Sequence, residues 1–269
     1  MLLAAMVAQA FQDVEARHQL LEGFVRRLAK SRDADAYALR GGILVRHWFP
    51  NVGRPVGDID LVCALPYDAQ DLRGRLADVL ATQLPDGVTF DAERFRVDQL
   101  RPRSMHPGLR LFATGRDGGW SSEMTVDLTF GLDVWPAAGR GEFQTERGSA
   151  DLWMCQPEML LGRKLQVTAE LWRRFWRPKD LGDLWLLAER FAPTRHALDE
   201  TIERSFAGQP SEQIDRFAEM FASPSFWADE RAARRWQGYV RKAGLRLPRD
   251  IERVLAPLRT LLTPVSRTR

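Results

Sequence analysis

The pattern of apolar residues along the chain changes near residue 150, and this change constrains the fold more than any other feature of the sequence. Before it, short aliphatic runs of extended type alternate with helical segments and Gly-rich turns. After it, apolar residues recur at helical spacing, with interruptions near Pro210, Pro224 and Pro248. The sequence therefore predicts an α/β (α+β) domain with a mixed sheet over residues 1–150 and an all-helical domain over residues 151–269.

The pattern also predicts the order of the elements. We expect a helix over residues 1–30, a strand over 37–39, a helix over 43–49 and a strand over 58–63. Asp68 is expected to cap a helix that runs to about residue 84. Strands over 109–114 and 123–130 flank the turn GRDGGW as a hairpin, a loop covers 136–148, and helices begin at Pro157 and Pro178.

Composition excludes several classes of protein. With 45% hydrophobic and 28% charged residues, the chain has the composition of a globular protein rather than a disordered or fibrous one. The apolar stretch 1–8 is far shorter than a membrane span and has no basic residues before it, so we expect a cytoplasmic protein that is not bound to a membrane. Cys63 and Cys155 are isolated, which suggests neither a disulfide framework nor a zinc site.

Charge is distributed unevenly along a chain whose net charge is +3. Residues 1–150 are slightly acidic, whereas residues 231–269 contain eleven basic side chains and two acidic ones. A basic segment of this kind suits contact with a polyanion, and it is equally compatible with a solvated Arg-rich helix and tail. Lysine is rare: the chain contains only Lys30, Lys164, Lys179 and Lys242.

Two aspartates carry the first chemical signal. Asp58 and Asp60 are two residues apart in the predicted strand 58–63, so both carboxylates project from one face, about 7 Å apart along the backbone. A divalent cation would relieve their repulsion, and Mg²⁺ favours one or two protein carboxylates together with substrate phosphate oxygens. Asp127, flanked by aliphatic residues, is a candidate third carboxylate on a neighbouring strand. An isolated pair of this type is also common in turns and on solvated strand faces.

A glycine pair strengthens this interpretation. Gly41 and Gly42 lie between a predicted strand and helix, where a bare backbone lets a ligand approach and the amides of the helix start favour phosphate oxygens. A tight turn would need the same residues. Arg40, Arg46 and Arg54 border this region and could complement phosphate charge.

Two blocks of sequence together resemble a known family. The first comprises RGGILVR at 40–46 and RPVGDIDL at 54–61, and the second comprises GRKL at 162–165 and RPKDLGDL at 177–184. They are similar to the signatures of the AbiEii/AbiGii toxin family, within the polymerase-β-like nucleotidyltransferase superfamily. The chain departs from the family at Val56, where Thr or Ser is usual, and at Gly57, where a longer side chain is common.

The resemblance implies a nucleotidyltransferase fold in the N-terminal domain and a Mg²⁺-dependent (or Mn²⁺-dependent) enzyme that transfers NMP from an NTP to an acceptor. The implied acceptor is RNA, at the 3′ end of tRNA, and the implied role is that of a toxin with a cognate antitoxin, or of a phage-defence protein. The catalytic candidates are Asp58, Asp60, Asp127, Lys164 and Asp183, the first three as metal ligands; candidates for nucleotide binding are Gly41, Gly42, Arg46, Lys179 and Asp180.

The expected roles of these residues differ. Lys164, on a helix expected to face the cleft, would neutralise the triphosphate as a point charge. Lys179 and Asp180 would position Lys164 or the acceptor, although these two residues and Asp183 also suit a surface helix start with acids at its positive end. Two other functions remain open: nucleotidyl transfer to a small molecule or a protein hydroxyl, and nucleotide binding without catalysis.

Overall fold

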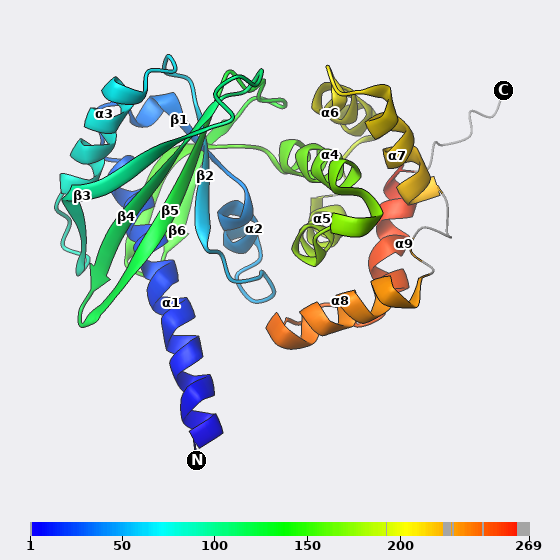
Figure 1. Ribbon diagram of the computed structural model, residues 1–269, viewed down its shortest axis with the longest axis horizontal. Coiled ribbons are helices and arrows are strands. Elements are labelled where there is room, and N and C mark those ends of the chain that lie inside the picture. The colour runs from blue at the N-terminus through cyan, green and yellow to red at the C-terminus, as the bar shows by residue number, and fades with distance from the viewer. Residues whose placement is uncertain (1, 192, 223–226, 228, 244, 263–269) are drawn as a thin grey trace. The chain divides into compact units, whose positions relative to one another are not determined.

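The computed structural model describes all residues except 1, 192, 223–226, 228, 244 and 263–269. It divides into two compact units, one formed by 1–47, 55–133 and 138–155 and the other by 48–54, 134–137 and 156–269. The first contains a mixed seven-stranded sheet, and the helices α4 to α9 belong to the second (Figure 1). None of the helices in the described chain is both long enough and apolar enough to cross a bilayer.

The α/β unit is built on a sheet of order β3-β4-β5-β2-β1-β7-β6. The pairs β2–β5 and β1–β7 are parallel and the other neighbours are antiparallel. The strands are β1 (Tyr37–Arg40), β2 (Asp58–Cys63), β3 (Val88–Leu100), β4 (Gly108–Asp117), β5 (Trp120–Phe130), β6 (Gly139–Thr145) and β7 (Gly148–Met154). The helices are α1 (Leu2–Leu28), the short 3₁₀ helix η1 (Ala34–Ala36), α2 (Gly42–Trp48) and α3 (Ala69–Ala81).

Alternation along the strands gives the sheet two unlike faces. Leu111, Val126 and Ile59 have no exposed surface and contribute to the core. Helix α1 packs against β3, β4, β5 and β7, and α3 packs against β3. The residues that alternate with these buried ones point to the opposite side of the sheet and are only partly buried; we call this side the polar face.

Helix α1 is fixed by buried ion pairs as well as by apolar packing. Arg27 is fully buried and donates to both carboxylate oxygens of Asp86, at 2.9 and 3.1 Å, while Arg26 donates to Asp86 at 2.8 Å. Burial alone would raise the pKa of Asp86, but hydrogen bonds from the two arginines lower it to about 2. The loop before β3 is thereby joined to α1 by a fully paired carboxylate.

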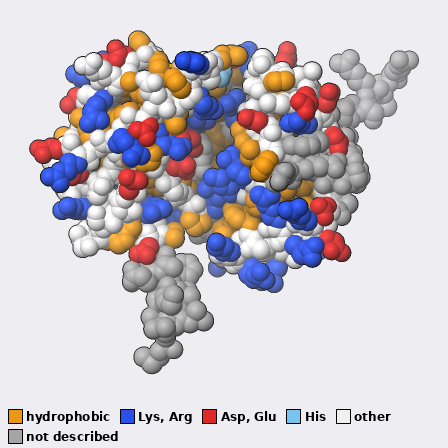
Figure 2. Space-filling view, in the orientation of Figure 1, with side chains coloured by type: hydrophobic (Ala, Val, Ile, Leu, Met, Phe, Trp, Pro, Cys, Tyr) orange, Lys and Arg blue, Asp and Glu red, His pale blue; other side chains and the backbone are white. Residues whose placement is uncertain are grey.

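The helical unit contains α4 (Pro157–Phe175), α5 (Pro178–Phe191), α6 (Arg195–Phe206), α7 (Ser211–Ala222), α8 (Glu230–Ala243) and α9 (Ile251–Leu262). Helix α4 packs on α5, α6 and α7, and α5 packs on α8 and α9. Helix α8 buries Ala232, Trp236 and Val240 and exposes its basic residues, and Figure 2 shows basic side chains gathered over it. The strong amphipathic pattern of α8 explains this division.

The predicted mixed α/β fold class is confirmed, and two expected boundaries need correction. The loop predicted over 136–148 contains strand β6, because this Gly-rich segment buries only Phe143 fully and is extended through pairing with β7 rather than by its own propensity. Helix α3 ends at Ala81 rather than near residue 84, since Pro85 disfavours helical backbone just before it. The predicted N-cap is confirmed: Asp68 accepts from the amides of Gln70 and Asp71.

Proline interrupts the helical unit near two of the three predicted positions. Pro210 separates α6 from α7 and Pro248 separates α8 from α9, whereas Pro224 lies outside the described residues. A further break, before α6, was not predicted; there Thr194 caps the helix by accepting from the amide of Ala197 at 3.3 Å.

Candidate active site

Strand pairing brings the three predicted carboxylates together on the polar face of the sheet. Asp58 and Asp60 are both partly exposed and lie on the same side of β2. The parallel register places Asp60 directly beside Asp127 of β5. Residues in register on neighbouring strands lie about 5 Å apart, so three acids separated by up to 69 positions share one small area.

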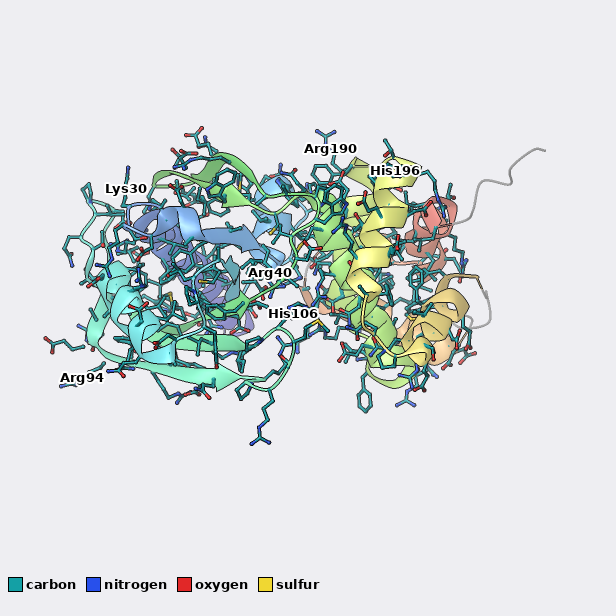
Figure 3. All side chains as sticks on the ribbon, turned by 90° about the horizontal axis from the view of Figure 1, so that it is seen from above. Lys30, Arg40, Arg94, His106, Arg190 and His196 are labelled. Atoms are coloured by element: carbon teal, nitrogen blue, oxygen red, sulfur yellow. The ribbon has the colours of Figure 1, made fainter. Side chains whose placement is uncertain are left out.

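An arginine stands on each side of these carboxylates. The register of β1 with β2 places Arg40 beside Asp60, and the closest approach of the two side chains is 3.6 Å. Arg40 also donates to Thr129 Oγ1 at 2.9 Å, and Figure 3 labels it among the side chains of the α/β unit. On the other side, Arg110 of β4 lies beside Asp127 and donates to both of its oxygens at 2.6 Å. Four adjacent strands thus carry the row Arg40, Asp60, Asp127 and Arg110.

Gly41 is required by the backbone at the edge of this row. Its φ of +78° is in the left-handed region, and a Cβ at this position would overlap Asp60 Oδ2 and lie 2.8 Å from Asp60 Cγ. Gly42 begins α2, whose first backbone hydrogen bond runs from Val45 to the Gly41 carbonyl. Gly41 therefore brings bare backbone against the Asp60 carboxylate, and a role of the glycine pair in binding a ligand stays a prediction.

Arg46 does not join this group. Its Nε donates to His18 Nε2 at 2.9 Å and its guanidinium lies 3.6 Å from Glu15, both residues of α1. Its contacts connect α2 to α1, so the structure does not bring Arg46 to the carboxylates.

The second sequence block forms a buried ion-pair cluster within the helical unit. Lys164 of α4 lies 2.7 Å from Asp183 and 3.3 Å from Asp180, both on α5. Arg177 adds a 2.6 Å contact to Asp180, and Arg54 donates to both oxygens of Asp183 at 3.2 Å. Each aspartate is therefore shared by Lys164 and one arginine.

Burial and charge oppose each other in this cluster. The side chains of Asp180 and Asp183 are 6% and 2% exposed. Burial would raise the pKa of Asp180, but the charges of Lys164 and Arg177 hold it below its usual value. Burial likewise disfavours the charged form of Arg54, yet the charge of Asp183 raises its pKa above the ordinary range. Lys179 lies in the first turn of α5, half-buried.

Sequence reasoning missed three features of these groups. Arg110 was not singled out, although its position between two leucines in LRL predicts a residue on the polar face. Arg54 was assigned to phosphate, but it pairs with Asp183, 129 positions away. Tyr239 of α8 was also missed: burial raises its pKa to about 12, and the charge of Arg54 acts in the opposite direction. Only the folded chain shows these long-range pairings.

The polar face presents carboxylate oxygens, the ligand type that a hard divalent ion prefers. Within the described residues, no group of three or more His, Cys, Asp and Glu side chains is placed to hold one. Asp127 is held instead by the fork of Arg110, which donates to both of its oxygens. Asp58 and Asp60 still supply two hard oxygen donors on one face, which fits Mg²⁺ because that ion takes one or two carboxylates together with substrate phosphates.

Comparison with known proteins finds solved structures that resemble this chain. A crystal structure of the protein JHP933 from Helicobacter pylori has a TM-score of 0.54 at 13% identity, covering 93% of this chain and 90% of that chain. A candidate nucleotidyltransferase from the same organism has a TM-score of 0.49 at 14% identity, covering 93% and 92%. At such low identity the first likeness concerns the fold alone. No curated protein matches the sequence.

A family model gives the assignment. It matches residues 23–257, which include β2, the glycine pair and the Lys164 cluster, and it describes the nucleotidyl transferase AbiEii toxin of a type IV toxin–antitoxin system. The chain therefore belongs to the AbiEii nucleotidyltransferase toxin family.

Proposed function

We propose that this nucleotidyltransferase is a Mg²⁺-dependent toxin that transfers NMP from an NTP to an RNA acceptor, the 3′ end of tRNA, in the cytoplasm. In this reaction an acceptor oxygen forms a bond to the α-phosphorus, and the bond from that phosphorus to the pyrophosphate leaving group breaks. The observation that carries the proposal is the in-register placement of Asp60 on β2 and Asp127 on β5. They lie beside Gly41, a position where any side chain would overlap Asp60.

The residues have distinct roles in this proposal. Asp58 and Asp60 hold the ion, which when bound supplies positive charge to the triphosphate oxygens. Gly41 and Gly42 offer backbone to the phosphates. Asp127 lies beside Asp60, where it is the candidate to orient the acceptor hydroxyl.

The helical unit contains a largely buried positive charge, the ammonium of Lys164. Lys164 is the candidate point cation for the triphosphate, and its side chain is 12% exposed. Asp183 and Asp180 orient Lys164 through contacts of 2.7 and 3.3 Å, which makes them positioning residues. Lys179, next to Asp180, is the candidate to assist at the acceptor or the nucleotide.

The test is transfer of label from each of the four α-labelled NTPs to total tRNA in the presence of Mg²⁺. We expect one NTP to label RNA and both Asp58→Ala and Asp60→Ala to abolish labelling. Asp78→Asn is the matched control, because this exposed acid lies on α3 and should retain full activity. Absence of label with every NTP, or equal label in the Asp58 and Asp60 variants, would reject the proposal.

An RNA acceptor is supported by the basic face of α8. Arg231, Arg234, Arg235, Arg241 and Lys242 are exposed on this helix, opposite its buried apolar residues. Each phosphate contact contributes about 0.7–0.9 to the slope of log K against log salt. The double variant Arg234→Gln/Arg241→Gln should therefore weaken tRNA binding and reduce that slope by roughly 1.5. Arg195→Gln/Arg204→Gln on α6 is the control, since that helix carries more Asp and Glu than Arg side chains and so presents no basic face.

An unchanged slope would favour the alternative acceptor, a small molecule or a protein hydroxyl. Metal-dependent NTP binding without any product would favour the non-catalytic alternative. The family description also implies a cognate antitoxin, and we infer a role in phage defence or growth control. Induced expression of the chain alone should arrest bacterial growth, whereas Asp58→Ala should not; equal growth of the two strains would contradict toxicity through transfer.

A further inference from the structure

Arg110 is paired with the carboxylate of Asp127, the acid that would otherwise be available as a third metal ligand beside Asp58 and Asp60. Its Nε and one terminal nitrogen each donate to a different oxygen of Asp127 at 2.6 Å, so the guanidinium fork covers the carboxylate. Both side chains are on the polar face, with exposed fractions of 38% for Arg110 and 17% for Asp127. The pair is only partly buried, so solvent has access to it.

The sheet explains why the two residues meet and why the contact can open. Cross-strand register fixes Arg110 beside Asp127 on one side and beside Asp98 of β3 on the other. Asp98 is 47% exposed and lies 3.1 Å from Arg96 of its own strand. Arg110 therefore stands between two acids in the same row, and leaving Asp127 would still place it next to a carboxylate.

A metal ion bound at Asp60 would be repelled by the positive charge of Arg110 at Asp127. Asp60 and Asp127 are in register on adjacent strands about 5 Å apart, so an ion bridging them would lie within a few ångströms of the guanidinium. Like charges at that separation repel strongly where solvent is partly excluded.

We propose that Arg110 is the counter-charge that keeps Asp127 out of the metal site, so that a divalent ion is first held by Asp58 and Asp60 and engages Asp127 only when Arg110 is displaced. This inference rests on the proposed function insofar as the ion binds at Asp58 and Asp60. It makes Arg110 a positioning residue that sets the affinity of the acidic row for the ion.

The test measures Mn²⁺ affinity by titration calorimetry without nucleotide, at fixed pH and ionic strength. Arg110→Gln should bind Mn²⁺ at least about tenfold more tightly than the parent chain, because it removes a positive charge and releases a ligand. Asp127→Asn should weaken binding more in the Arg110→Gln background than in the parent chain, since Asp127 is a ligand only in the former. This non-additivity is the diagnostic result.

Two controls make the test decisive. Arg116→Gln removes an exposed arginine from the same face of β4, six positions away, and should change Mn²⁺ affinity by less than twofold. Arg110→Met preserves the apolar stem of the side chain and provides a second neutral variant, with folding checked by circular dichroism.

Equal or weaker Mn²⁺ binding in the neutral Arg110 variants, or an additive cycle with Asp127→Asn, would overturn this inference while leaving an ion at Asp58 and Asp60 intact. Absence of Mn²⁺ binding in the parent chain, with no change in Asp58→Asn, would instead contradict the metal site of the proposed function. The two failures are therefore distinguishable.

Discussion

Replacing Asp183 by Asn tests whether the ion-pair cluster of the helical unit depends on charge. Asp183 is 2% exposed, accepts from Arg54 at 3.2 Å and lies 2.7 Å from Lys164. The amide retains the shape but removes the negative charge, so two cations that are each 12% exposed lose a counter-charge. Breaking a buried pair in this way costs 3–5 kcal/mol, and since Asp180 still pairs with Lys164 we expect about 3 kcal/mol.

The assay is urea and thermal unfolding followed by circular dichroism at pH 7. A cost of about 3 kcal/mol corresponds to a fall of about 6–12 °C in Tm for a chain of this size. Asp199→Asn is the control, because Asp199 is 52% exposed in an i,i+4 pair with Arg195 and should change stability by less than about 0.5 kcal/mol. Adding Arg54→Met to Asp183→Asn should recover part of the loss. A cost below about 1 kcal/mol, or no recovery, would refute the electrostatic explanation.

Three further changes probe the site and its support. Gly41→Ala should lower Mn²⁺ affinity and cost about 1–2 kcal/mol of stability, because the left-handed backbone resists a Cβ and the new methyl displaces Asp60; calorimetry and melting would show both effects. Asp86→Asn should cost about 2 kcal/mol at pH 7. Because the folded pKa of Asp86 is depressed to about 2, this difference should persist above pH 4 and vanish as the pH falls through 2, as acid titrations of both chains would reveal. Lys164→Arg should reduce NMP transfer by at least about tenfold, because a planar fork does not reproduce a point charge between two carboxylates; full activity would remove Lys164 from the mechanism.

The sequence alone was sufficient for the elements whose pattern is local. Alternation placed Asp58 and Asp60 on one face of a strand, and Asp68 identified a helix start, because period and capping depend on neighbours in the chain. Strand β6 was missed because its pairing with β7, rather than its own residues, makes it extended. Local pattern thus predicts an element where the element is stabilised locally.

The partners of the site residues could not be predicted in the same way. Arg110 meets Asp127 only because β4 and β5 pair in one register, and a shift by one residue would send Arg110 to the apolar face. Arg54 meets Asp183 across 129 positions, a distance that no periodicity spans. Charge complementarity alone does little to identify which arginine pairs with which acid, because the chain contains 35 arginines.

The aspartates of the two sequence blocks differ in burial and in how closely they are paired, which separates their roles. Asp58 and Asp60 are partly exposed on a sheet face, where the guanidinium of Arg40 approaches Asp60 only to 3.6 Å and both side chains remain in contact with solvent. Asp183 is buried and already shared by two cations, so an additional metal ion there would have to displace Arg54 or Lys164 at a cost of several kcal/mol. Asp183 is therefore suited to orient Lys164 rather than to bind metal. A lysine also fits this position better than the arginine that the chain uses almost everywhere else, because one ammonium can contact both Asp180 and Asp183 and still present a donor to a third group.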